Sequence, residues 1–316
     1  MVFDRLKSML GGREDGPSEP LRQALLPITA VSNPLYDRAV AFVHDGSSPE
    51  VLLELDGAHQ PELMTLLKYP AQLQSWSRWL PDDVKVRLRE AGVSGDPNKT
   101  VPNSRSQLYR NTTVTQPQFL RFGYVLAAIG QGPNRQVPGV PKWLTALAND
   151  LCMVLDRVAL PHLRWPPERF ADLLSNDGMA EVDIAATVLL ALSEQANIYG
   201  SSVVQPHELP GIDNYLLGFG HQIPPQAVLR LSADGRKGIA ERVTANPPVG
   251  PVLAPIIAQL AIDKAKGVRA AAIAALALLP GDLQTNALRP VLLTAPAAQS
   301  AELIEYLSRT QAGGAL

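Results

Sequence analysis

The chain has 316 residues, of which 46% are hydrophobic and 18% charged, and its formal net charge is −2. Because soluble domains usually contain about 25% charged residues, this composition favours a surface that a partner or another domain partly covers. The lysines and arginines are scattered along the chain. This disfavours nucleic-acid binding, which depends on clustered basic residues that neutralise phosphates.

The single cysteine, Cys152, excludes an intrachain disulfide and fits a reducing compartment. It stands in the apolar run 147–160, so we expect a small buried hydrophobe and not a nucleophile. No apolar run reaches the roughly 18 residues of a membrane span, and the N-terminus lacks the pattern of a signal peptide. We therefore expect a cytoplasmic protein.

The first part of the chain divides into two predicted sections. Residues 1–20 are expected to be an N-terminal segment followed by a linker rich in glycine, proline and acidic residues. Residues 21–92 read as a helical region whose short helices begin at prolines. Asn33 and Pro34, for example, supply an N-cap and a first helical residue, and predict a helix over 34–44. A second such start predicts a helix over 48–55.

Two features of this part are candidates for partner binding. Trp76 and Trp79 are spaced to share a helix face, as core residues or as an aromatic platform for a ligand. Residues 93–117 form the longest polar stretch, predicted to be a domain boundary and a binding loop. Arg105, Tyr109 and Arg110 within it complete the set of candidate interaction residues.

From residue 118 to 316 the apolar residues repeat with the period of a helix, and no alternating pattern of strand length appears, so the predicted fold class is all-α. The expected helices lie over 118–129, 141–160, 166–178, 180–196, 213–219, 224–231, 237–244, 250–279 (a hairpin), 283–293 and 301–310.

The hairpin over 250–279 is the most informative stretch. It reads as two helices joined by a tight turn, and its second helix carries one apolar stripe. The stripe is mostly alanine, which lets a neighbouring helix approach closely. It consists of Val268, Ala271, Ala272, Ala275, Leu276 and Leu279.

The order Asp263, Val268-Arg269, Ala271-Ala272, Ala275-Leu276 resembles a HEAT repeat. Residues 182–192 align with 268–278, although Asp183 stands in the place of Arg269. The resemblance implies an α-solenoid of HEAT-like helical hairpins, irregular in the N-terminal third, with residues 118–316 as the HEAT-like repeat region. It also implies that Asp263 and Arg269 form a structural ladder between repeats. An alanine-rich hairpin in an ordinary helical bundle is the alternative reading.

We find no HExxH, GxSxG, Walker or CxxC motif, so no catalytic, metal or cofactor-binding residue is predicted. The favoured function is a non-enzymatic scaffold that binds another protein. The alternatives are a HEAT-like nucleic-acid-binding protein and an enzyme whose site is assembled from remote residues near 93–117. The C-terminal helices lack a polar cap, which suggests a larger bacterial chain or an assembly through these helices.

Overall fold

The computed structural model describes residues 34–56, 82, 86, 108–110, 114–129, 136–158, 165–194 and 208–308. Within these residues every regular element is a helix and none is a strand, which confirms the all-α prediction. No helix of this part is long and apolar enough to cross a membrane.

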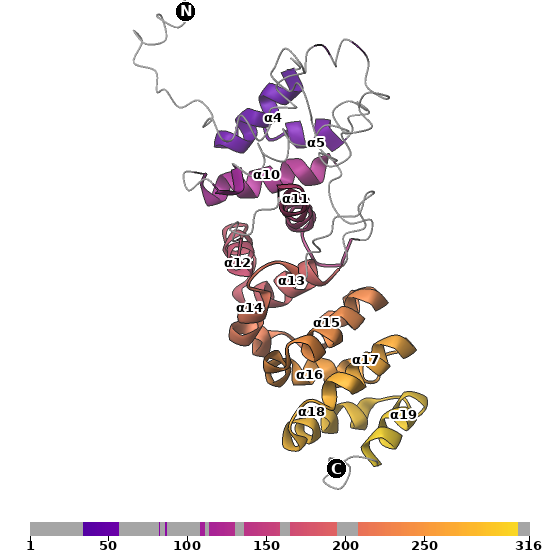
Figure 1. The fold of residues 1–316 in the computed structure, drawn as a ribbon. Helices are drawn as coiled ribbons and strands as arrows, with labels where there is room; N and C mark the ends of the chain where they lie inside the picture. Colours follow the sequence, from indigo (N-terminus) through magenta and orange to yellow (C-terminus); the bar gives the residue numbers. More distant parts are fainter. Residues whose placement is uncertain are drawn as a thin grey trace, which may run out of the picture.

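The helices follow one another through the molecule in nearly the order of the chain, from α4 at one end to α18 and α19 at the other (Figure 1). The α-helices are α4 (Pro34–Asp45), α5 (Val51–Asp56), α10 (Gln116–Ala128), α11 (Lys142–Val158), α12 (Pro167–Asn176), α13 (Glu181–Ser193), α14 (Ile212–Phe219), α15 (Ala233–Ala245), α16 (Gly250–Leu260), α17 (Lys266–Leu276), α18 (Gly281–Thr294) and α19 (Ala297–Ser308). The 3₁₀ segments are η3 (Gly220–Gln222), η4 (Pro225–Arg230) and η5 (Pro247–Val249).

Several helices begin where polar or proline residues satisfy their first turn. At the start of α10 the side chain of Gln118 accepts a hydrogen bond from the backbone N–H of Thr115, at 3.0 Å. At the start of α15 the hydroxyl of Ser232 accepts one from the N–H of Gly235, also at 3.0 Å. This cap starts α15 at Ala233, earlier than the predicted residue 237.

Helix α10 is central to the N-terminal part of the structure. It packs against α4 and α5 on one side and against α11 and α12 on the other. Residues 108–110, inside the stretch predicted to be a polar loop, are helical, and Leu108 and Tyr109 are buried. Within the described part of that stretch, Leu108, Tyr109 and Val114 belong to the core, while Arg110, Thr115 and Pro117 are exposed.

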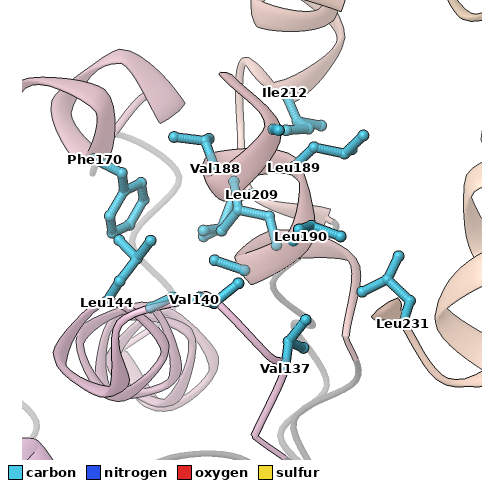
Figure 2. Close-up of a cluster of buried hydrophobic side chains, with 14 of the residues drawn as sticks. Val137, Val140, Leu144, Phe170, Val188, Leu189, Leu190, Leu209, Ile212 and Leu231 are labelled. Carbon is cyan, nitrogen blue, oxygen red and sulfur yellow. The ribbon is translucent and has the colours of Figure 1, made fainter. Parts of the chain in front are cut away.

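Helix α13 lies in the middle of the chain and is buried over most of its length. Figure 2 shows its side chains among residues of the surrounding elements: Leu144 of α11, Phe170 of α12, Ile212 of α14 and Leu231. Because α13 carries apolar residues around its whole circumference, neighbours must cover it on several sides.

The C-terminal helices alternate between two layers. Helix α15 packs on α17, and α16 packs on both α17 and α18. The alanine-rich stripe of α17 faces this packing: Val268, Ala272, Ala275 and Leu276 are buried, and Ala271 is partly buried. The buried stripe predicted from the period of the sequence is confirmed.

Candidate binding groove between α14 and α15

One face of α15 packs on the core and a second face does not. The core face consists of Gly235, Arg236, Ile239, Ala240 and Val243. The second face carries Gly238, Glu241, Arg242 and Ala245, spaced i, i+3, i+4 and i+7, so these four residues lie along one side of the helix. They line a groove that α14 borders with Asp213.

A long segment of chain connects the two helices that border the groove. Residues 220–232 contain η3 and η4, and both segments pack against α13 and α16. In the next hairpin, residues 261–265 join α16 to α17 directly, and those helices pack against each other.

The α14–α15 groove has an outer part of about 240 Å³. The outer part is lined by Asp213, Gly238, Glu241, Arg242, Ala245 and Asn246. A narrow recess of about 10 Å³ adjoins it, shares Gly238 and Arg242, and reaches apolar residues of four helices. These are Leu189, Leu192, Ile212, Leu216, Ile239 and Leu253. A polar rim therefore surrounds a small apolar floor.

Gly238 faces open space in the groove. A Cβ atom added there would meet no atom within 4 Å. A glycine inside a helix lowers helix stability by about 1 kcal/mol relative to alanine. No closely packed neighbour requires a glycine at position 238. The missing side chain instead contributes space to the groove.

The charges at the rim pair with each other. Arg242 Nη1 lies 2.5 Å from Asp213 Oδ1, so this ion pair joins α15 to α14 across the groove. Glu241 Oε1 lies 3.0 Å from Lys237 Nζ on the same helix. The neighbouring Tyr215 of α14 is buried, and burial, together with the carboxylate of Glu168, raises the pKa of its phenol to about 12.

Of the two residues predicted to form the ladder, Asp263 lies at the turn between α16 and α17, and Arg269 lies in the first part of α17. The carboxylate of Asp263 is buried and pairs with Arg236 of α15: Nε lies 2.7 Å from Oδ2, and Nη2 lies 3.1 Å from Oδ1. Arg269 Nη1 donates instead to the backbone carbonyl of Asp263, at 2.8 Å. The side chain that reaches Asp263 from a preceding helix is thus Arg236, which the sequence reading missed.

Of the candidate interaction residues, two lie in the described part of the chain. Tyr109 is only 2% exposed, and its hydroxyl donates to Asp150 Oδ2 at 2.7 Å. Its carbonyl accepts from Trp165 Nε1 at 3.1 Å. Burial leaves almost no surface of Tyr109 for a partner, while the adjacent Arg110 is exposed. Trp76, Trp79 and Arg105 lie outside the described residues.

Asp213, Gly238 and Arg242 were not singled out from the sequence. Gly238 is the second residue of the helix predicted over 237–244, and only the earlier start of α15 at Ala233 places it in a helix interior, where a glycine usually has a packing or functional reason. The other two residues are 29 positions apart, and no local pattern links them.

The described residues hold no group of three or more His, Cys, Asp or Glu side chains placed to bind a metal ion. Cys152 is buried as predicted, and burial raises the pKa of its thiol far above the ordinary range. A thiol in that state is a poor nucleophile. No protein-family model, curated protein or solved structure matches the chain.

Proposed function

We propose that this chain is a helical-repeat scaffold of HEAT-like hairpins that binds another protein, and that the α14–α15 groove is the contact site. The observation that carries the proposal is the groove itself: a concave surface with an apolar floor and a polar rim is typical of binding sites. Its position between two hairpin helices, where longer connecting segments separate them, fits a repeat modified for binding.

Two features of packing support the repeat part of the proposal. Alternating helices pack within two layers, α15 on α17 and α16 on α18. The buried Arg236–Asp263 pair joins α15 to the turn of the following hairpin. Contacts between neighbouring hairpins of this kind are the main interactions in an α-solenoid.

The proposal also keeps two expectations from the sequence, a cytoplasmic location and an assembly through the C-terminal helices. Leu293 of α18 is 82% exposed and Ile304 of α19 is 55% exposed, which supports an assembly through the C-terminal helices. Such exposed apolar residues are frequent at contact surfaces when they gather in a patch.

The test is affinity capture from native lysate with three forms of the full chain: wild type, Gly238→Leu and Gly218→Leu. Leucine at 238 fills the groove. Gly218 of α14 offers a matched control, because an added Cβ there also meets no atom within 4 Å and Gly218 does not line the groove. Captures are run at two salt concentrations, with mass spectrometry and nucleic-acid staining.

We expect a protein that wild type and Gly218→Leu retain at the higher salt and that Gly238→Leu loses. Equal capture by all three forms would contradict the groove as the contact site. Recovery of nucleic acid that disappears at higher salt would favour the nucleic-acid-binding alternative, because such binding weakens as salt competes for the phosphates.

A further inference from the structure

We propose that the α14–α15 groove accepts one large uncharged side chain of the partner protein, while Arg242 and Asp213 hydrogen-bond the peptide groups beside that side chain. The inference rests on the proposed function and names the chemistry of the ligand at the same site. Three properties of the groove carry it: its size, its paired charges and the polar atoms that remain at its rim.

The size of the groove favours a single side chain. Pockets for drug-sized ligands and cofactors usually occupy about 300–1,000 Å³. The outer part of this groove, at about 240 Å³, is smaller. The adjoining recess of about 10 Å³ has room for little more than one water-sized group. A single leucine or aromatic side chain over Gly238, with its tip toward the recess, fits this shape.

The charges of the groove favour an uncharged occupant. Arg242 and Asp213 neutralise each other across the groove, and Glu241 pairs with Lys237. The lining therefore offers no unpaired charge to a charged ligand. A charged ligand would therefore find no unpaired counter-charge to offset the hydration that it loses on entering the groove.

The atoms that remain at the rim suit a peptide backbone. Within the described part of the chain, the Arg242–Asp213 pair uses Nη1 of one side chain and Oδ1 of the other. The remaining N–H groups of Arg242 can donate, and Oδ2 of Asp213 can accept. A peptide unit brings one carbonyl acceptor and one N–H donor, so a partner backbone can bond to both side chains without breaking the pair.

The floor supplies the apolar contact. Ile212 and Leu216 of α14 and Ile239 of α15 lie at the recess and are nearly fully buried. Figure 2 shows Ile212 beside Leu189 of α13, the edge of this floor. Because these floor residues are already nearly buried, an apolar side chain seated there would gain mainly by removing its own surface from water, at about 25 cal/mol per Å².

The probes for this inference are four blocked amino acids: the N-acetyl amides of tryptophan, leucine, lysine and glutamate. Each probe carries two peptide groups and one side chain, and the set differs in charge. Binding to the full chain is followed through the methyl resonances of Ile212 and Ile239, which report on the groove floor. Titrations use wild type, Gly238→Leu and the control Gly218→Leu.

We expect the tryptophan and leucine amides to shift both methyl resonances in a saturable way, at least tenfold more tightly than the lysine and glutamate amides. Gly238→Leu should weaken this binding at least tenfold, and Gly218→Leu should leave it unchanged. Equal or tighter binding of a charged amide, or no shift with any amide, would overturn the inference. The comparison between amides on wild type decides this even where Gly238→Leu does not fold.

The two proposals fail separately. If the uncharged amides bind in the groove but Gly238→Leu captures the same proteins as wild type, the proposed function is wrong. The inference that the groove accepts an uncharged side chain is then still supported. If a captured protein depends on the groove while the charged amides bind best, the proposed function stands and this inference is wrong.

Discussion

Two consecutive helix pairs in this chain reach opposite outcomes with similar helices. In the α16–α17 hairpin, a short turn lets the helices pack, and buried Asp263 lies at that turn. In the α14–α15 pair, η3 and η4 occupy the connection, and a groove remains between the helices. In these two pairs the shorter connection accompanies packed helices, and the longer connection accompanies an open groove.

The largest expected effect concerns the closed hairpin. Asp263→Ala leaves the buried Arg236 guanidinium without its carboxylate, and breaking a buried pair in this way costs about 3–5 kcal/mol. Chemical denaturation should show this loss in the free energy of unfolding. The matched control replaces both residues, Arg236→Met with Asp263→Leu, and should recover much of the loss. A loss below about 1 kcal/mol, typical of a surface pair, would mean that this contact does not hold the hairpins together.

Arg269→Ala should have a smaller effect at the same turn. The side chain donates to the part-buried carbonyl of Asp263 and to the exposed carbonyl of Lys264; its loss leaves the first without this donor, while water can replace it at the second. We expect about 1–3 kcal/mol of destabilisation, measured by thermal or chemical unfolding. Arg269→Lys keeps the charge and one donor group, so its free energy of unfolding should lie between those of wild type and Arg269→Ala. An effect of Arg269→Ala larger than that of Asp263→Ala would reverse the order of importance proposed for this turn.

Replacing glycine by alanine should have opposite signs in the two helix pairs. At Gly250 of α16 a Cβ would lie 2.6 Å from Leu279 Cδ2 and 3.2 Å from Val243 Cγ1, so overpacking should cost about 1–3 kcal/mol. At Gly238 of α15 an added Cβ would meet no atom within 4 Å. Alanine at this position should therefore stabilise the helix by up to about 1 kcal/mol. Parallel denaturation of the two variants measures both signs. Destabilisation by Gly238→Ala would indicate that the groove closes in solution.

The ion pair across the groove should contribute little to stability. Asp213 and Arg242 are partly exposed, and such pairs contribute about 0.2–1 kcal/mol. Asp213→Ala should therefore lower the free energy of unfolding by no more than this, and less at high salt because salt screens the attraction. Asp213→Asn is the control that keeps the shape. A loss of several kcal/mol would assign the pair a structural role instead of a role in binding.

Ionisation of the Tyr215 phenol should have the smallest effect on the free energy of unfolding at neutral pH and a measurable effect at alkaline pH. Its folded pKa of about 12 lies above the ordinary value of 10.0, so the unfolded chain releases the phenol proton first. The contribution of Tyr215 to stability is complete below pH 10 and is lost as pH rises toward 12. Denaturation curves over this range should fall more steeply for wild type than for Tyr215→Phe. Parallel curves would show that α14 does not bury this phenol in solution.

The helices could be predicted from the sequence because their signals are local. The period of 268–279 predicted the buried stripe of α17, and Asn33 and Pro34 predicted the start of α4. The start of α15 was missed because the serine cap at Ser232 was not recognised. Tyr109 was assigned to a polar loop because the few apolar residues around it gave no sign of the aromatic cluster that buries it.

The groove could not be predicted in the same way. Its rim depends on Asp213 and Arg242, which come from two different helices and lie 29 positions apart in the sequence. The buried pair of Arg236 and Asp263 likewise joins residues 27 positions apart. Both features depend on the path of the chain in space, which neither helix period nor capping residues specify.

The most direct test of the central claim, that the partner contacts the α14–α15 groove, is site-specific photo-cross-linking. A benzophenone amino acid is placed at Ala245, an exposed residue of the groove rim, or at Ala274, an exposed residue of α17 away from it. After illumination in native lysate, we expect the captured partner to be cross-linked from position 245 and not from position 274. Equal cross-linking from both positions, or cross-linking only from 274, would contradict the account.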